Sequence, residues 1–190
     1  MISGIRAALL AALLSWSGAA VADDWGLDEL GQALADAPDE RIAFREERSI
    51  AFLAAPIIVT GYVARQDGRI EKHVVAPKRE SVILDGSHME VESEEGWQSY
   101  DIDDHPALRG LATALQAGLT GRFEPAEELF DIDVTGDRAA WAVTLSPKPG
   151  PVAEAIEAIA LTGMAARIDT IEIREADGDR SLMTLRHGSE

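Results

Sequence analysis

The sequence predicts an α+β fold, mainly β: a curled antiparallel sheet with a helix across its open side. Short segments rich in Ile, Val and Phe recur along the chain and are separated by turn residues. Two amphipathic segments interrupt them, so the order is helix, about five strands, helix, about five strands. Hairpin turns at this spacing favour one antiparallel sheet. About ten strands is near the limit of an open sheet, so the sheet should curl into an incomplete barrel.

The first helix is predicted over 27–38. Leu27, Leu30 and Leu34 recur there at helical spacing, and Pro38 ends the pattern. The period then changes to short β-type segments, and Asp-Gly pairs at 67–68 and 85–86 indicate hairpin turns. Strands are expected at 41–53, 57–66, 69–77, 80–86, 88–94 and 97–102.

The second helix is predicted over 106–121. Asp103 or Asp104 can cap it, and Pro106 suits its first turn. A short helical turn should follow over 125–129. The helix carries an apolar stripe that consists of Leu108, Leu111, Ala112, Leu115 and Leu119.

The last third of the chain is predicted to form strands again. We expect turns at 135–137 and 177–179, and we interpret only the second half of the ambiguous segment 155–163 as a strand. The other strands are expected at 130–134, 139–147, 167–175 and 180–187. No repeat or linker interrupts the chain, so 23–190 should be a single domain.

The first 22 residues are predicted to be a secretory signal peptide. Arg6 supplies the positive start, an apolar run extends from Ala7 to Leu14, and Ala20-Val21-Ala22 matches a cleavage signal. A membrane anchor is the alternative, but this run is too short to span about 30 Å of hydrocarbon. An Ala-rich leader before an acidic chain is typical of bacteria, so we expect the mature protein in the periplasm.

Composition excludes several classes of function. The net charge of −17 argues against nucleic acid as a partner and against adsorption to anionic headgroups, so only a transient approach to a membrane is expected. Hydrophobic residues make up 46% and are spread along the chain, which argues against disorder. The absence of cysteine excludes disulfides, thiolate metal sites and a cysteine nucleophile.

Catalytic and metal-binding motifs are absent from the sequence, so we predict no enzyme activity, no cofactor and no metal. The Asp-rich stretch 101–105 could suggest a metal site, but a helix cap is the simpler interpretation. The turn 177–179 lacks the full spacing of a calcium loop, and Arg180 could pair with one of its two Asp residues. The four histidines are not at ligand spacing: His73, His88, His105 and His187.

The leucine stripe has two interpretations. Amphipathic helices usually bury such a stripe in an ordinary core. Alternatively, the helix covers a hollow that accepts an acyl chain, with Leu111 and Leu115 facing inward one turn apart. The candidate residues lining that hollow are Leu108, Leu111, Leu115, Leu119, Ile58, Tyr62, Val74, Val91, Trp141, Val143 and Ile171.

Four features follow one another along the chain. They are a strand pair with Gly61, then Pro77, then a strand that ends in Asp85-Gly86, and finally a strand with Met89-Glu90-Val91 that leads to the helix. Their order resembles the LolA family of periplasmic lipoprotein carriers over about residues 27–187. The closing EADGDRSLM is most similar to the LolA-related proteins encoded with aryl polyene biosynthesis genes. The stretches that carry the resemblance are 43–63, 72–92 and 168–185.

The resemblance implies a half-barrel of about eleven strands, with helices as a lid over an apolar cavity. It implies an acylated lipoprotein or lipid as cargo, and donor and acceptor proteins at the inner and outer membranes as partners. Lipoprotein carriers of this family have an Arg-Pro pair shortly after the Gly that corresponds to Gly61, and its Arg helps hold the lid. Here Asp67-Gly68 stands instead, flanked by Arg65 and Arg69, which become the lid-holding candidates. This departure favours a related cargo, such as an acylated polyene lipid.

Two main function hypotheses follow. The first is a carrier that shields acyl chains from water, and the alternative is a non-carrier lipid-sensing or assembly module with the same fold. A carrier needs a vacant cavity, whereas a module would have a filled core and an exposed patch. A hydrolase is the least favoured function, because no nucleophile–base pair is evident in the sequence.

Overall fold

The computed structural model describes residues 25–38, 40–66 and 68–188. The predicted leader over 1–22, and Asp67 of the predicted 67–68 turn, lie outside them. Among the described helices, none is both long and apolar enough to cross a membrane. The elements are α1 (Leu27–Ala35), β1 (Arg41–Ser49), β2 (Ile57–Gln66), β3 (Arg69–Ala76), β4 (Glu80–Asp85), β5 (His88–Ser93), β6 (Gly96–Asp101), the 3₁₀ turn η1 (Ile102–Asp104), α2 (Pro106–Thr120), α3 (Glu124–Glu127), β7 (Phe130–Asp137), β8 (Ala140–Pro147), β9 (Ile156–Met164), β10 (Arg167–Glu175) and β11 (Arg180–Arg186).

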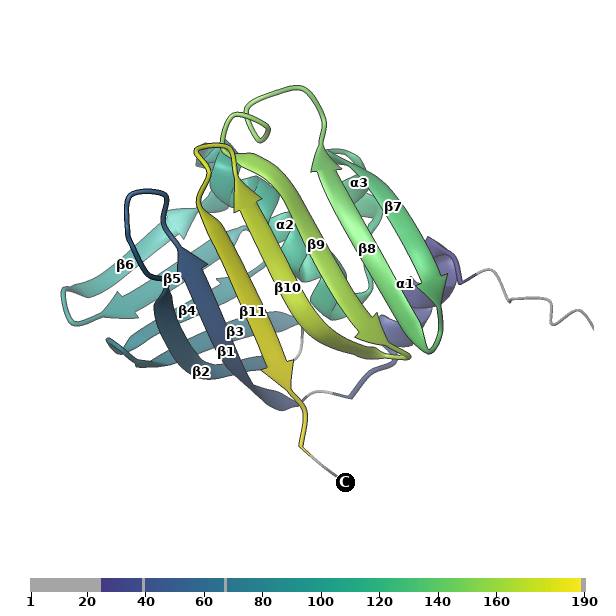
Figure 1. Cartoon of the computed structure of the whole chain (residues 1–190), viewed down its shortest axis with the longest axis horizontal. Helices are drawn as coiled ribbons and strands as arrows, with labels where there is room; N and C mark the ends of the chain where they lie inside the picture. Colours follow the sequence, from purple (N-terminus) through teal and green to yellow (C-terminus); the bar gives the residue numbers. More distant parts are fainter. Residues whose placement is uncertain (1–24, 39, 67, 189–190) are drawn as a thin grey trace, which may run out of the picture.

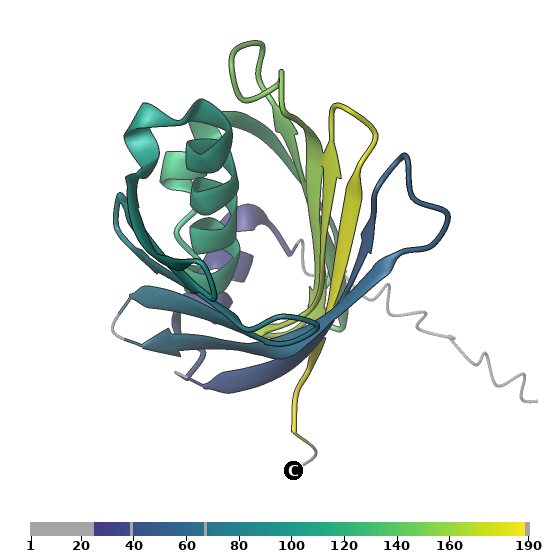
Figure 2. The same cartoon turned by 90° about the vertical axis from the view of Figure 1, so that its left-hand side faces the viewer.

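All eleven strands form one antiparallel sheet in the order β6-β5-β4-β3-β2-β1-β11-β10-β9-β8-β7. Strands β6 and β7 are its two edges, and η1, α2 and α3 connect them in the sequence. The sheet curls into a half-barrel, and α2 lies across its open side (Figures 1 and 2). The predicted mainly-β fold, with an antiparallel sheet of about eleven strands that does not close, is therefore confirmed.

A close backbone approach at Gly61 bends the sheet between β2 and β3. The register of the two strands shifts between Thr60 and Gly61, and such irregularities bend a strand. A Cβ atom at Gly61 would lie only 1.9 Å from the carbonyl oxygen of His73, so no larger residue fits without moving the backbone. Beyond this bend, β3–β6 form one wall of the half-barrel, and β7–β11 form the other (Figure 2).

The core lies between the helices and the concave face of the sheet. In α1, Leu30 and Leu34 are buried at the predicted helical spacing. Every second residue of β8 is buried, as expected for a strand with one face against a core. The largest fully buried side chains are Trp141, Phe130, Leu30, Leu145, Ile159 and Leu161.

The helix cap predicted at Asp103 or Asp104 is wrong. Helix α2 does begin at Pro106, but its N-cap residue is His105 and no side chain caps it. The carboxylate that caps belongs to Asp101, which accepts a hydrogen bond from the backbone N–H of Asp103 (3.1 Å) at the start of η1. The acidic stretch therefore folds as its own short turn before the helix.

Some strand boundaries also differ from the prediction. The strand predicted at 41–53 ends at Ser49, because the chain then turns, with the Leu53 N–H donating to the Ile50 carbonyl oxygen (2.9 Å). Strand β7 continues to Asp137, so the turn predicted at 135–137 lies instead at 138–139. The Oδ1 atom of Asp137 fixes it there, because it accepts hydrogen bonds from the N–H groups of Ala139 (2.8 Å) and Ala140 (3.1 Å). Strand β9 begins at Ile156, so nearly all of the ambiguous segment 155–163 is extended, not only its second half.

Candidate functional site

A cavity of about 440 Å³ lies between α2 and the concave face of the sheet. This volume is within the range of roughly 300–1,000 Å³ that is typical of small-molecule sites. The wall consists mainly of aliphatic side chains, which would exclude water from an apolar guest. The apolar lining residues are Leu108, Leu111, Ala112, Leu115, Ile50, Ile70, Val82, Leu84, Met89, Ile171, Ile173 and Met183.

Helix α2 approaches the rest of the protein most closely through small residues, whereas its leucines are only partly buried against the core. Its buried residues are all Gly or Ala. A Cβ atom at Gly118 would lie 2.6 Å from Leu161 Cδ1 on β9, and one at Gly110 would lie 2.5 Å from Val152 Cγ1. This close approach anchors one face of the helix. Leu111 and Leu115 are only half-buried and border the cavity.

The predicted lining residues fall into separate groups. Leu108, Leu111, Leu115 and Ile171 line the cavity. Leu119 lies further along α2, at a second cavity of about 40 Å³ that Arg65 also lines. Val91 shares the strand face of the lining residue Met89 and is half-buried. Three others, Val74, Trp141 and Val143, are buried in the core instead of lining the cavity.

Ile58 and Tyr62 lie on the convex face of β2, away from the cavity. Successive side chains of a strand alternate between its two faces. Val63 is buried on the concave face, whereas Ile58 is 38% exposed. The Tyr62 ring stacks on His73, with 4.6 Å between ring centroids, and the Arg41 guanidinium lies 4.3 Å from its centroid. Because β2 is apolar on both faces, its sequence pattern did not reveal which residues point inward.

Arg65, at the end of β2, connects the C-terminal ends of α1 and α2. Its Nη1 atom donates to the backbone carbonyl oxygens of Leu34 (3.0 Å) and Leu119 (2.7 Å), and its Nη2 atom donates to that of Ala37. The last carbonyls of a helix lack intrahelical partners, and a cation is favoured there. Arg69 instead pairs with Asp85 on β4, with Nη2 2.9 Å from Oδ2.

A buried acidic side chain interrupts the apolar wall of the cavity. Glu46 on β1 accepts hydrogen bonds from Lys72 Nζ (2.6 Å), Ser181 Oγ (2.7 Å) and Arg48 Nε (2.9 Å). Burial alone would raise the pKa of Glu46, but the hydrogen bonds from Arg48, Lys72 and Ser181 and the positive charge of Lys72 outweigh it and lower this pKa to about 2. Burial lowers the pKa of Lys72, although Glu46 opposes that effect. We name these four residues the Glu46 cluster.

Glu46 is not among the site residues predicted from the sequence. A chain with 34 acidic residues makes one more Glu in a strand inconspicuous. The available signal was its position two residues after Phe44. Alternation places both side chains on the same, concave face of β1, and the structure shows both of them buried.

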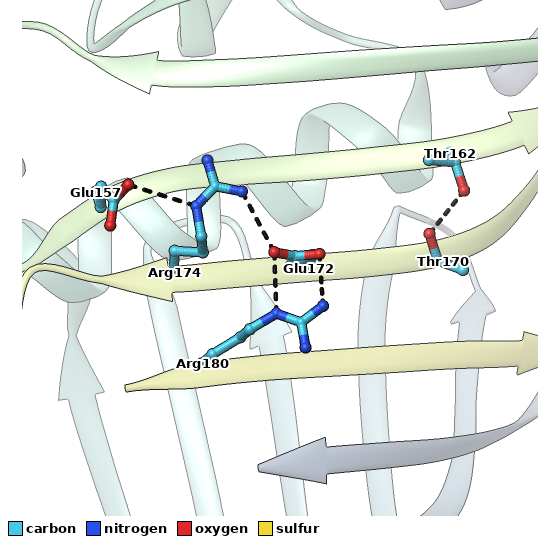
Figure 3. Close-up of polar contacts among 6 residues, drawn as sticks. All are labelled: Glu157, Thr162, Thr170, Glu172, Arg174 and Arg180. Carbon is cyan, nitrogen blue, oxygen red and sulfur yellow. Dashed lines mark hydrogen bonds and ion pairs between the residues drawn. The ribbon is translucent and has the colours of Figure 1, made fainter. Parts of the chain in front are cut away.

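The convex face of the sheet is solvated and carries a row of ion pairs (Figure 3). Glu172 accepts hydrogen bonds from Arg180 Nε (3.1 Å) and Arg180 Nη2 (2.9 Å), and a third from Arg174 Nη1 (3.3 Å). Arg174 also lies 3.5 Å from Glu157. The expected pairing of Arg180 with an Asp of the 177–179 turn is therefore wrong, because the sheet register directs this side chain along the convex face.

Loops border one end of the cavity. Ser49 and Ile50 at the end of β1 line it together with Glu175 and Asp179 of the β10–β11 hairpin. The backbone N–H of Ala51 donates to Asp179 Oδ1 (2.9 Å), which connects the two loops. The β1–β2 loop also carries exposed apolar side chains, those of Phe52 and Leu53.

No metal-binding site is evident in the described part of the chain. Within residues 25–38, 40–66 and 68–188, no three His, Asp or Glu side chains gather closely enough to hold a metal ion. The cavity instead combines an aliphatic wall with one polar cluster. That arrangement can bind an amphiphile, with its chain on the apolar wall and a polar group at the cluster.

The chain matches one family model, described as outer membrane lipoprotein carrier protein LolA-like, over residues 16–189. No curated protein matches it. Among solved structures it is similar to a LolA superfamily protein from Nitrosomonas europaea, at 9% identity and a TM-score of 0.45 over 85% of this chain and 90% of that one. It is also similar to the lipoprotein LppX of Mycobacterium tuberculosis (12%, TM-score 0.40, 84% and 92% covered) and to LprF from Mycobacterium bovis (11%, TM-score 0.33, 85% and 91% covered).

Proposed function

The chain belongs to the family of outer membrane lipoprotein carrier LolA-like proteins, and from this premise we propose that it carries an acylated molecule in its apolar cavity. The observation that supports the proposal most strongly is the cavity of about 440 Å³ beneath the leucine face of α2. Each buried CH₂ group contributes about 0.8 kcal/mol, so a long acyl chain binds without any catalytic group.

In this proposal α2 is the lid. Leu108, Leu111 and Leu115 contact the cargo from above. Arg65 holds the ends of α1 and α2 on the half-barrel through its three carbonyl contacts. Cargo entry then requires movement of α2 relative to the sheet, and the Arg65 contacts oppose that movement.

The proposed place of action is the periplasm, with residues 1–22 as a removed leader and 23–190 as the carrier domain. The net charge of −17 keeps the protein away from anionic membrane surfaces between transfers. The exposed side chains of Phe52 and Leu53, beside one end of the cavity, offer an apolar contact. That contact suits a donor protein at the inner membrane and an acceptor at the outer membrane.

The cargo that we favour is an acylated lipid of the polyene type rather than a lipoprotein. Two features of the sequence favour this choice: the closing segment 175–183, and the Asp67-Gly68 pair where lipoprotein carriers have Arg-Pro.

The carrier function predicts that acyl chains bind and stabilise the fold. We expect the protein to bind an uncharged fluorescent acyl probe. Its melting temperature should rise once the probe concentration exceeds the dissociation constant. At a probe concentration one hundred times that constant, the free energy of unfolding should be higher by about 2.7 kcal/mol. Fluorescence titration and thermal unfolding measure the two effects. Unchanged melting at saturating probe, without a fluorescence change, would favour the non-carrier module instead.

A further inference from the structure

The Glu46 cluster places hydrogen-bond donors on the wall of an apolar cavity. The Glu46 side chain is 4% exposed, whereas those of Lys72 and Arg48 are 25% and 41% exposed. All three residues line the cavity. A guest in the cavity can therefore reach the two cations, while the carboxylate between them is already enclosed.

The hydrogen bonds inside the cluster occupy both carboxylate oxygens of Glu46 but only some of the N–H donors of Lys72 and Arg48. Both carboxylate oxygens of Glu46 accept: Oε1 from Arg48 and Ser181, and Oε2 from Lys72 and, at 3.4 Å, Arg48. An ammonium has three donor N–H bonds and a guanidinium has five. Glu46 takes one from Lys72 and two from Arg48. The cluster thus has donors left over, and the group that fits it is an acceptor.

The charge around the cluster disfavours an anion as that acceptor. Three cationic residues line the cavity, namely Lys72, Arg48 and Arg180. Four carboxylates line it as well, those of Glu46, Glu80, Glu175 and Asp179. An ionised headgroup would lose its hydration without meeting a net positive field, whereas a neutral carbonyl oxygen accepts hydrogen bonds at a smaller desolvation cost.

We propose that Lys72 and Arg48 bind the neutral ester or amide carbonyl that joins an acyl chain to the rest of the cargo. This inference rests on the proposed carrier function and names the part of the cargo that the cavity recognises. The chain lies against the leucines of α2 and the aliphatic wall, and the carbonyl oxygen accepts from the spare N–H groups. The cavity accordingly selects esterified or amidated chains over free fatty acids.

The test compares ligands of one chain length: methyl dodecanoate, N-methyldodecanamide, ionised dodecanoate at pH 8, and dodecane as the chain-only reference. Each displaces 1-aminoanthracene from the wild-type protein. The ester and the amide should bind about tenfold more tightly than dodecanoate, because the ionised carboxylate loses more hydration on entering the cavity. Equal or tighter binding of dodecanoate would overturn the inference and leave the carrier function standing.

Two lysine variants locate the effect. Lys72→Met retains an apolar side chain of similar length and leaves Glu46 bonded to Arg48 and Ser181. It should weaken ester and amide binding about tenfold and leave dodecane binding unchanged. Lys78→Met is the matched control, because it removes the same charge from an exposed position. Equal weakening of all ligands by Lys72→Met, or none, would overturn the inference. Failure of every ligand to bind the wild type would overturn the carrier function with it.

Discussion

The variant Leu115→Arg is expected to remain folded and to bind acyl chains roughly hundredfold more weakly than the wild type. Leu115 is half-buried and borders the cavity, whereas α2 packs on the protein through Ala114, Ala117 and Gly118. An arginine at position 115 can extend its guanidinium toward water while its stem stays on apolar surface. A chain in the cavity would then lose part of its apolar wall and lie beside a charge that it cannot solvate.

Urea unfolding and displacement of the acyl probe measure the two effects. Leu182→Arg is the matched control, because Leu182 lies between the lining residues Ser181 and Met183 on β11 and so points to the convex face. This control should keep both its fold and its affinity. Collapse of the Leu115→Arg fold would contradict the lid hypothesis and make the leucine stripe ordinary core. A cost of about 2–5 kcal/mol for Leu115→Ala would indicate the same.

Glu46→Gln is expected to remove a pH-dependent contribution to stability of about 3 kcal/mol. The pKa of Glu46 is about 2 in the folded protein, below its ordinary value of 4.5. A lowered pKa stabilises the fold above about pH 4.5, and this contribution disappears as the pH falls toward 2. The variant also leaves Lys72 and Arg48 without their counter-charge on the cavity wall.

The quantity to measure is the difference in unfolding free energy between wild type and Glu46→Gln from pH 7 to pH 2. It should be largest at pH 7 and should shrink toward zero at the acid end. Glu157→Gln, on the convex face, is the control. Its side chain is 63% exposed and forms only a long ion pair, so its difference should stay small throughout. A difference for Glu46→Gln that does not change with pH would contradict the assigned role of the carboxylate.

The architecture could be predicted because its signals are local. Asp-Gly turns and short β-type segments placed most strands within a few residues of their bounds. The Pro106 start and the leucine spacing placed α2. Errors arose where a side chain decided the outcome, as when Asp137 moved a turn to 138–139 and Asp101 took the cap expected from its neighbours.

The site was predictable only where an element has one apolar stripe. Helix α2 has such a stripe, so Leu111 and Leu115 could be placed at the cavity from their spacing. Strand β2 is apolar on both faces, so Ile58 could not be assigned to a side until its neighbours were known. Trp141 has the right alternation, but the close contact of its ring with Gly163 on β9 places it in the core.

Contacts between distant segments were beyond sequence reasoning. The Glu46 cluster combines β1, β3 and β11, and Lys72 reaches Glu46 across β2. The family resemblance predicted a lid-holding role for Arg65. The segments that this side chain joins could be identified only from the fold. Both depend on the curl of the sheet, which brings residues far apart in the sequence to the same wall.

Native mass spectrometry of the wild-type protein, purified from the periplasmic fraction of the cells that produce it, tests the carrier function most directly. We expect a species heavier than the polypeptide by the mass of one acylated molecule, which dissociates on activation. Leu115→Arg, purified in the same way, should lack this species, and Leu182→Arg should retain it. A wild-type spectrum that contains only the mass of the polypeptide, together with no binding of the acyl probe in solution, would contradict the account.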